Sequence, residues 1–543
     1  MQRLHKFFEV VSRNRPPVFE AHGLLRRAGP LCFAFFMVAC ASQDSTAPVG
    51  YDQARAEHLF SEGYKNVSDI YIEEVPVQDL AIAGMSSLAS IDPAIDVEAI
   101  GNRLRVNFDG HQMASYPMPD PNDAQAWGAL TAAVISASRY HSEDLDAADP
   151  ERLYEVVFDG LLTALDSFSR YAGRDAAREN RASREGFGGI GVRIRLIEEG
   201  VQVLSVMEDT PAEEAGVLQD DIIVAIDDSS VEGLSQRDVV NRLRGRTGSE
   251  VRLSIEREAA AAPMSIAVVR THIVPQTVSY HRESNLAYIR LTGFNNRTAD
   301  TLRQKIRQAQ NEIGSDLRGY ILDLRGNPGG LLEQAIAVSD VFVTGGRIVS
   351  THGRHTDSHQ YFRAKEDDLT DSAPVVVLID GGSASASEIV AAALQDSGRA
   401  VVVGSSSFGK GTVQTVLPLP NNGEFILTWA RFHAPSGYAL HRRGVLPDIC
   451  TTGDVTSPAD VLARLHSGAL PLAANLRRLD VDTNDEVAVE ELRAHCPTRE
   501  GDEEIDMKVA QQLLEEPGLY ARTLHGQPDT AATGKSPVPG SGS

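Results

Sequence analysis

The sequence predicts an α/β protein of several domains, and two observations lead to that prediction. The chain has 543 residues, more than one hydrophobic core usually organises. Between residues 273 and 450, continuous apolar runs at 319–325, 373–379 and 399–403 alternate with stretches of helical periodicity. Because strands buried on both faces of a sheet are apolar throughout, this region is expected to form a sheet covered by helices. The Asn-Asn-Gly sequence at 421–423 then predicts a hairpin.

The composition is that of a soluble globular protein, with 42% hydrophobic and 23% charged residues. These values disfavour wholesale disorder and a polytopic membrane protein. A formal charge of -24 repels phosphate backbones, so nucleic acid is not expected as a partner. Only seven of the 51 basic residues are lysines. Lys410 lies in an apolar, glycine-rich stretch, where its amine, unlike a guanidinium, can lose its proton.

Residues 1–39 have the pattern of a signal peptide, in which two arginines precede a short apolar run that stops at Ala39-Cys40. The end of this run resembles a bacterial lipobox, which implies lipidation of Cys40 and a place on the periplasmic face of the cell envelope. Ordinary secretion with cleavage near Ala41 is the alternative. In either case the space is oxidising, so Cys450 and Cys496 form a disulfide or remain two buried free cysteines.

Residues 40–185 and 451–530 are expected to be mainly helical, one region on each side of the α/β core. Within the first, apolar positions recur at helical spacing at 80–88 and 153–165, and each stretch contains an internal glycine. Gly, Ser and Pro prevail at 531–543, which predicts a disordered tail.

Residues 186–272 predict a small α+β module. Short β-rich runs are separated by a helix that begins at Pro211 and by another at 235–243. This order resembles a PDZ domain, a module that binds the C-terminal carboxylate of a peptide with successive backbone N–H groups and adds the peptide as a strand. The resemblance assigns peptide binding to the glycine-rich loop formed by Gly188, Gly189, Ile190, Gly191 and Val192.

Two segments carry the residues expected to do chemistry. Residues 380–388 follow a buried strand and read Asp-Gly-Gly-Ser-Ala-Ser-Ala-Ser-Glu, a pattern that predicts a tight turn exposing a hydroxyl beside the free N–H groups of a helix start. Residues 406–414 contain Lys410 and Gln414, which alternation along an extended strand would place on one face. Apolar neighbours would lower the pKa of the Lys410 amine and let it take a proton from a serine.

With Asp-Leu-Arg-Gly-Asn-Pro-Gly-Gly at 323–330, these segments resemble the carboxyl-terminal processing peptidases, or tail-specific proteases, over roughly residues 70 to 450. The resemblance implies a ClpP/crotonase-like ββα catalytic core, with the PDZ domain inserted and a helical domain before it. It also implies a Ser-Lys dyad assisted by a glutamine, with the lysine twenty-five positions after the serine. Lys410 is then the base, Gln414 orients it, and Ser385 is the nucleophile.

Ser383 and Ser387 are the alternatives to Ser385, and they are expected otherwise to cap the helix with their hydroxyls. In the same resemblance the N–H of Ala386 faces the oxyanion of the tetrahedral intermediate. A glycine of the turn at 329–330, assigned to Gly329, supplies the second N–H donor.

Other polar clusters suggest different chemistry. Five histidines (His352, His355, His359, His433 and His441) suggest a Ser-His-Asp hydrolase, but no Gly-x-Ser-x-Gly sequence frames the serines and no His-Glu-x-x-His sequence indicates zinc. Residues 480–491 partly match a calcium loop, although Asp485 stands where glycine is needed, so a helix-capping turn is favoured. Arg325 is either a substrate clamp or an anchor for Asp323.

The sequence thus predicts a serine endopeptidase of the cell envelope that needs no cofactor and no metal. Its expected partners are protein or peptide substrates with apolar C-termini, and a lipid anchor is the expected contact with the membrane. A homo-oligomer is left open. Two alternative hypotheses are a PDZ-containing scaffold that has lost the activity of its dyad, and an acyl-CoA-processing enzyme that shares the ββα core.

Overall fold

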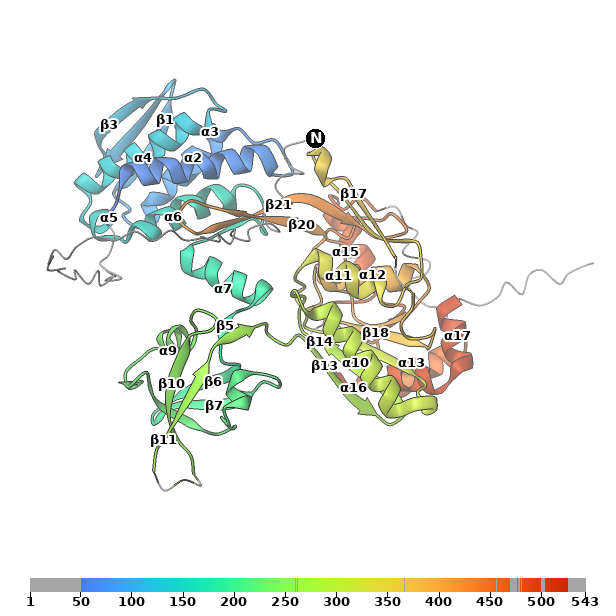
Figure 1. The fold of residues 1–543 in the computed structure, drawn as a ribbon. Coiled ribbons are helices and arrows are strands. Elements are labelled where there is room, and N and C mark those ends of the chain that lie inside the picture. The colour runs from blue at the N-terminus through green and yellow to red at the C-terminus, as the bar shows by residue number, and fades with distance from the viewer. Residues whose placement is uncertain are drawn as a thin grey trace, which may run out of the picture. The chain divides into compact units, whose positions relative to one another are not determined.

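A computed structural model of the chain describes residues 50–525, apart from 259, 261, 366, 456, 469–475, 477, 478, 480 and 500–502 (Figure 1). The predicted signal peptide, Cys40 and the tail at 531–543 lie outside the described residues.

The central sheet of the α/β core has the strand order β13-β14-β15-β18-β19-β22. Its strands are β13 (Val278–Glu283), β14 (Leu286–Leu291), β15 (Gly319–Asp323), β18 (Val375–Ile379), β19 (Val401–Gly404) and β22 (Ile449–Cys450). From β14 to β22 all neighbours pair in parallel. Every residue of β15, β18 and β19 is buried. This confirms the prediction that the continuous apolar runs form strands covered on both faces.

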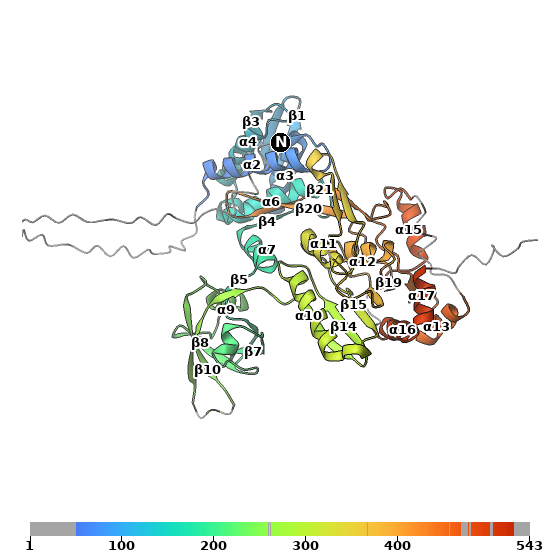
Figure 2. The same ribbon diagram turned by 45° about the vertical axis from the view of Figure 1, so that its right-hand side comes forward.

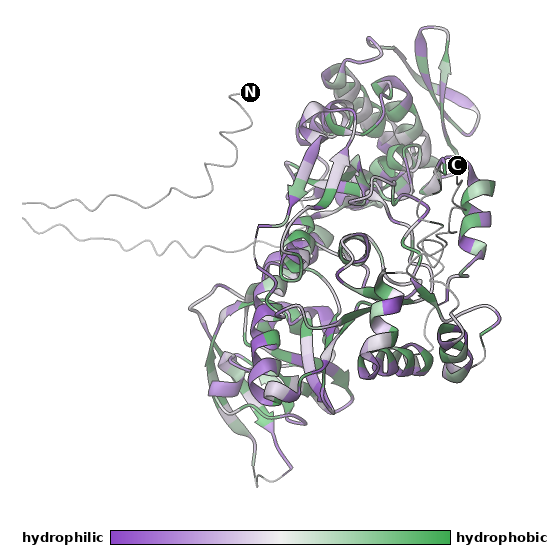
Figure 3. Ribbon diagram, turned by 90° about the vertical axis from the view of Figure 1, so that its right-hand side faces the viewer, coloured by the Kyte–Doolittle hydropathy of each residue, from purple (hydrophilic) through white to green (hydrophobic). Residues whose placement is uncertain are grey.

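Different helices cover the two faces of this sheet (Figure 2). They are α10 (Thr298–Ile313), α11 (Leu332–Asp340) and α12 (Ala386–Asp396) on one face, and α13 (Pro458–His466), α16 (Glu503–Glu515) and α17 (Pro517–His525) on the other. Val377 of β18 packs with the first set, whereas the preceding Val376 packs with the second. The α/β class is therefore confirmed. The helices carry polar and apolar residues side by side, as Figure 3 shows.

A second sheet has the order β17-β16-β21-β20, with β4 paired to β21. Its strands are β4 (Arg170–Ala172), β16 (Arg347–His352), β17 (Gln360–Arg363), β20 (Thr412–Pro418) and β21 (Glu424–His433). The hairpin predicted at 421–423 joins β20 to β21. Phe425 of this hairpin packs into the core of the N-terminal region against Phe158, at a ring centroid distance of 4.7 Å.

The N-terminal region holds the predicted helices. They are α2 (Gln53–Ile70), α3 (Val77–Ser86), α4 (Ala124–His141), α5 (Glu143–Ala147), α6 (Pro150–Thr163) and α7 (Arg174–Glu185). The internal glycines of α3 and α6 allow the two helices to pack closely, since a Cβ on Gly84 would lie 2.7 Å from Val157 O and one on Gly160 would lie 2.0 Å from Ser87 Oγ.

The same region also contains a small antiparallel sheet that the sequence analysis missed. It consists of β1 (Ile95–Ile100), β2 (Arg103–Phe108) and β3 (His111–Pro117), joined by turns with positive φ at Gly101 and Asp109. The strands are short and largely exposed, and buried residues such as Val97 alternate with polar ones. A mainly helical assignment of residues 40–185 was therefore incomplete.

The PDZ module has a sheet ordered β11-β10-β8-β7-β6, with β9 beside β8. Its elements are β6 (Val192–Ile197), β7 (Gly200–Val206), α8 (Pro211–Glu214), β8 (Ile222–Ile226), β9 (Ser229–Ser230), α9 (Gln236–Leu243), β10 (Glu250–Glu256) and β11 (Met264–Val269). The two predicted helices are present. β5 (Phe187–Gly189) pairs with β12 (Thr271–Ile273), so the chain reaches and leaves the module through adjacent strands, as an inserted domain requires.

Beyond the core, α15 (Glu486–Ala494) also belongs to the C-terminal region. Cys450 of β22 and Cys496, which follows α15, form a disulfide across this region. Within the residues that the structure describes, no helix combines the length and apolarity that a bilayer span requires.

Candidate active site

Ser385 lies at the end of the loop that connects strand β18 of the central sheet to helix α12. β18 ends at Ile379, and α12 begins at Ala386 with Ser385 as its N-cap residue. Ser385 has φ 56° and ψ -111°, a conformation that non-glycine residues rarely adopt. Such strain persists only where the surrounding structure holds it, and it concentrates at functional sites.

The two alternative serines have hydroxyls that are already engaged. Ser383 Oγ donates to Leu324 O at 2.9 Å and accepts from Asp380 N–H, while Ser387 Oγ donates to Asn327 O at 2.9 Å. Both residues are 0% exposed, whereas Ser385 is partly exposed. Of the three serines, Ser385 is the one whose hydroxyl a substrate can reach.

Lys410 is half-buried just before β20, and its Nζ lies 5.3 Å from the centroid of the Phe168 ring. Burial is the largest cause that lowers the pKa of Lys410, and the charge of Arg170 lowers the pKa further. Glu388 and Asp166 act in the opposite direction without reversing the shift. Among the described residues, no hydrogen bond joins Lys410 Nζ to Ser385 Oγ.

Gln414 is placed differently from what simple strand alternation predicts. Lys410 precedes β20, which begins at Thr412, and a register shift between Val413 and Gln414 interrupts the alternation. The argument that both side chains share one face of a regular strand was therefore wrong. Gln414 Nε2 donates to Thr412 Oγ1 at 2.8 Å and to Thr428 Oγ1 at 3.3 Å, which leaves Oε1 as the atom that can accept from an amine.

Glu388, whose role the sequence analysis missed, connects the two segments. Its Oε2 accepts from Ser385 N–H at 2.7 Å and from Lys410 N–H at 2.9 Å. Its Oε1 accepts from Ser407 Oγ at 2.5 Å and from Gly409 N–H at 2.7 Å. The side chain is 0% exposed, and this burial raises the pKa of Glu388 despite the hydrogen bonds that act against the shift. The only sequence signal was an acidic residue in the first turn of α12.

The turn at 326–330 packs directly against the serine. A Cβ on Gly329, whose φ is 102°, would lie 2.9 Å from both Ala386 N and Ser385 Cβ, so no side chain fits there. Gly329 N–H, however, already donates to Asn327 Oδ1 at 2.9 Å. This bond counts against the assignment of Gly329 as a free oxyanion donor and favours Gly330, the other glycine of the turn.

Arg325 anchors Asp323, one of its two expected roles. Arg325 is 4% exposed and Asp323 is 0% exposed, and Nη2 of the arginine lies 2.7 Å from Oδ2 of the aspartate. Arg325 Nη1 also reaches Asp506 Oδ2 at 3.2 Å, a partner from α16 that the sequence did not indicate. A side chain this buried does not clamp substrate.

The histidines do not assemble a triad with the serine. His359 Nε2 pairs with Gly353 O, and the rings of His352 and His433 lie 4.6 Å apart. The ring of His441 lies 6.5 Å from that of Phe168, the ring over which Lys410 Nζ lies. Burial and the charges of Arg431 and Arg442 lower the pKa of His441 to about 4. In the segment that resembled a calcium loop, Asp485 caps α15 by accepting from Ala488 N–H, as the capping alternative predicts.

The glycine-rich loop of the PDZ module leads into β6, an edge strand of its sheet. Gly188 O accepts from Gly245 N–H, and Gly191, with φ 86°, lies against Thr210. Gly188 and Gly189 belong to β5, so the five predicted residues span the approach to the open edge of the sheet.

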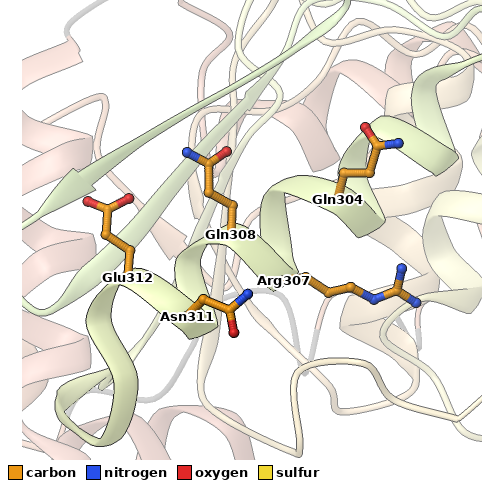
Figure 4. Close-up of a pocket in the computed structure, with 5 residues that line it drawn as sticks. All are labelled: Gln304, Arg307, Gln308, Asn311 and Glu312. Atoms are coloured by element: carbon orange, nitrogen blue, oxygen red, sulfur yellow. The ribbon is translucent and has the colours of Figure 1, made fainter.

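Figure 4 shows a surface pocket elsewhere in the catalytic core. It is lined by Gln304, Arg307, Gln308, Asn311 and Glu312. All five residues come from α10, and none is a predicted site residue. The pocket therefore belongs to a helix surface and not to the site around Ser385.

Two family models match the chain in the regions just described: the PDZ domain at residues 188–268 and peptidase family S41 at residues 285–451. A carboxy-terminal-processing protease of Bartonella bacilliformis is 43% identical over 313 residues, which are 57% of this chain and 72% of that protein. The chain belongs to peptidase family S41. The carboxy-terminal processing protease CtpA of Bacillus subtilis is 30% identical over 70% of this chain and 75% of its own length.

Membership of family S41 makes the chain a serine-type endopeptidase of the carboxy-terminal processing group that carries a PDZ domain. A solved structure of a photosystem II D1 C-terminal processing protease is 24% identical and covers 72% of this chain and 92% of its own, with a TM-score of 0.37. That score is too low to add to the argument.

Proposed function

We propose that this S41 peptidase cleaves protein substrates with a Ser385–Lys410 dyad, through an acyl-enzyme, after its PDZ module has captured the C-terminal segment. The observation that carries the proposal is the shared oxygen of Glu388, which binds the backbone of both dyad residues. Two further observations support it: Ser385 has the accessible hydroxyl of its cluster, and the pKa of Lys410 lies below its ordinary value.

The reaction begins when Ser385 Oγ attacks the scissile carbonyl carbon and gives its proton to the neutral amine of Lys410. Lys410 Nζ lies over Phe168 in this structure, so the transfer requires the lysine side chain to turn toward the serine once substrate is bound. Gln414 Oε1 accepts from the amine and orients it. The N–H of Ala386 and a glycine N–H of the 329–330 turn stabilise the oxyanion.

Collapse of the tetrahedral intermediate breaks the peptide bond, and the Lys410 ammonium returns its proton to the leaving amine. The acyl group remains on Ser385 Oγ. Lys410, neutral again, takes a proton from water, whose oxygen attacks the ester carbonyl. The bond between the acyl carbon and Ser385 Oγ then breaks, the Lys410 ammonium returns the proton to Oγ, and the second product leaves as an acid. Each proton that the lysine accepts is returned within the cycle, so no further co-reactant is needed.

The dyad is tested by cleavage of an unfolded reporter with an apolar C-terminus. Ser385→Ala and Lys410→Ala should each lower kcat by about ten-thousand-fold or more, because the two residues act as one unit. Lys305→Ala, at a lysine whose amine donates to Gln308 of its own helix, is the matched control and should keep full activity. Equal turnover by all variants would contradict the dyad and favour a scaffold whose dyad has lapsed.

The PDZ module is proposed to bind the carboxylate of the substrate tail at residues 188–192, while the tail pairs with the open edge of β6. A peptide with a free apolar C-terminus should bind and compete with the reporter. The same peptide with an amidated C-terminus should bind at least tenfold more weakly, because it lacks the charge that the N–H groups of the loop recognise. Equal affinity of the two peptides, measured by calorimetry, would contradict this assignment.

Lipidation of Cys40 is proposed from the sequence alone and places the enzyme in the bacterial envelope. The disulfide between Cys450 and Cys496 is the structural observation that fits an oxidising compartment. Incorporation of a labelled fatty acid should be lost in Cys40→Ser. Retention of the label in that variant would contradict lipidation at Cys40.

A further inference from the structure

The chain that connects the helical region to the catalytic core passes beside the candidate base. Residues 166–170, here named the 166–170 segment, follow α6 and lead into β4. β4 pairs antiparallel with β21, and Arg170 lies opposite Ile426. β21 also pairs with β20, which begins two residues after Lys410. The segment is therefore fixed to the strand that neighbours the lysine.

Phe168 is the residue of this segment that covers the lysine amine. Lys410 Nζ lies 5.3 Å from the centroid of its ring, and the ring of His441 lies 6.5 Å away at a steep angle of 76°. Phe168 and His441 are both half-buried, as is Lys410. One side of the amine thus lies against an aromatic ring.

Asp166 fixes the shape of the segment. Its Oδ1 accepts from Phe168 N–H at 2.6 Å and from Ser169 N–H at 2.8 Å, which turns the backbone and sets the direction of the ring. Ser169 Oγ donates to Oδ2 of the same aspartate at 2.8 Å. The position of Phe168 is therefore set by local hydrogen bonds and does not depend on packing alone.

Asp166 is also connected to Gln414, the residue proposed to orient the lysine, through Thr428. Thr428 Oγ1 donates to Asp166 Oδ1 at 3.3 Å and lies 3.3 Å from Gln414 Nε2, from which it accepts. Thr428 N–H donates to Ser169 Oγ at 3.1 Å, which ties the threonine to the segment a second time. One short segment thus contacts both Lys410 and the partners of Gln414.

We propose that Phe168 is a positioning residue for the general base: its ring keeps water from the Lys410 amine, and Asp166 acts through Thr428 to fix Gln414, the residue proposed to orient that amine. The inference rests on the proposed Ser-Lys function. It assigns a part in catalysis to the N-terminal helical region. The 166–170 segment lies far upstream of residues 285–451, which match the peptidase family, yet it contacts the proposed general base Lys410. The direction of the Lys410 pKa, lowered mainly by burial, agrees with this arrangement.

Two physical effects of the ring oppose each other and can be separated. Exclusion of water disfavours the ammonium and lowers the pKa of the lysine, whereas attraction between a cation and the ring face raises it. Phe168→Leu keeps an apolar cover and removes the aromatic face. Phe168→Gln keeps a side chain of similar length but places an amide next to the amine, where its oxygen stabilises the ammonium. The two variants form a matched pair that differs in polarity.

The experiment is the pH dependence of kcat/KM for the wild type and these two variants. Phe168→Gln should move the acidic limb to higher pH by about one unit and lower kcat/KM at neutral pH about tenfold. Phe168→Leu should leave the acidic limb of the pH profile of kcat/KM unchanged or move it to lower pH. Tyr140→Ala, at an aromatic residue that is 87% exposed, is the control and should change nothing.

A second measurement does not depend on turnover. Reductive methylation of Lys410, followed by mass spectrometry of its peptide across a pH series, reports the protonation of the amine directly. Identical profiles of the Leu and Gln variants in both measurements would overturn the inference. Loss of activity in Ser385→Ala and Lys410→Ala would at the same time leave the proposed function standing, so the two failures are distinguishable.

Discussion

The backbone N–H groups of Ser385 and Lys410 donate to the same atom, Oε2 of Glu388, at 2.7 and 2.9 Å. The two residues come from different turns of the chain, one at the start of α12 and one before β20. A common acceptor fixes their main chains relative to each other before any substrate arrives. One buried carboxylate thus sets the relative position of the two main-chain segments that carry the proposed dyad.

Glu388→Gln should disturb both the fold and the reaction. A glutamine presents one oxygen and one NH2 group to three backbone N–H donors and the Ser407 hydroxyl, so it leaves one or two of the four hydrogen bonds unmade. We expect a loss of about 2–5 kcal/mol in the free energy of unfolding. The value of kcat should fall even where the protein remains folded. Glu490→Gln, on the exposed side of α15, is the control, and an unchanged kcat in Glu388→Gln would contradict the role of the shared oxygen.

Lys410→Met should be inactive but no less stable than the wild type at neutral pH. The pKa of Lys410 is lowered in the folded protein, so folding disfavours the ammonium. This cost grows as the pH falls from the ordinary pKa of lysine to the folded-state pKa and is constant below it. Methionine carries no charge to desolvate. Thermal unfolding at several pH values should show a Tm equal to or above that of the wild type near pH 7. The advantage should disappear above the ordinary pKa of lysine, where both folded and unfolded amines are neutral. A clearly lower Tm at pH 7 would count against the assignment.

Removal of the disulfide should lower stability without removing the dyad. The bond joins Cys450 and Cys496 across a sequence separation of 46 residues, and closure of such a loop contributes about 2–4 kcal/mol. Chemical unfolding of Cys450→Ala/Cys496→Ala, compared with the wild type, checks this value. Addition of reductant should destabilise the wild type and leave the double variant unchanged. The same midpoint for the wild type with and without reductant would show that the bond does not contribute.

Arg325→Met should be among the most destabilising single substitutions in the core. It removes the guanidinium that binds both carboxylate oxygens of Asp323, which is 0% exposed and keeps Arg290 at 3.3 Å as its other guanidinium partner. Asp506 loses its contact with Arg325 as well. Breaking a buried ion pair by removing one partner costs about 3–5 kcal/mol. Asp506→Asn keeps a polar group that can accept from the arginine and should cost less. Denaturant unfolding of both variants measures the difference, and equal losses would contradict this ranking.

The sequence predicted the elements whose patterns are local. The apolar runs of β15, β18 and β19, the helix start within the serine cluster and the order of strands and helices in the PDZ module all follow from residues close together in the chain. The β1–β3 sheet was missed because its strands are short and mostly exposed, so alternation in a few residues was the only signal.

The parts of the site that the sequence did not predict depend on pairing between distant segments. Nothing in the neighbourhood of Asp166 indicates that β4 will pair with β21 or that Phe168 will meet Lys410. The hydrogen bond from Gly329 N–H to Asn327 is likewise a property of the folded turn. The register shift before Gln414 shows that even a regular strand pattern can mislead about which side chains share a face.

The most direct test of the Ser-Lys account is to label the folded enzyme with a fluorophosphonate, which reacts with activated serines, and to locate the adduct by mass spectrometry. The account predicts a single adduct on Ser385, lost in Lys410→Ala at neutral pH and gained with rising pH in the wild type as the lysine amine loses its proton. An adduct on Ser383 or Ser387, or equally fast labelling of Ser385 in Lys410→Ala, would contradict it.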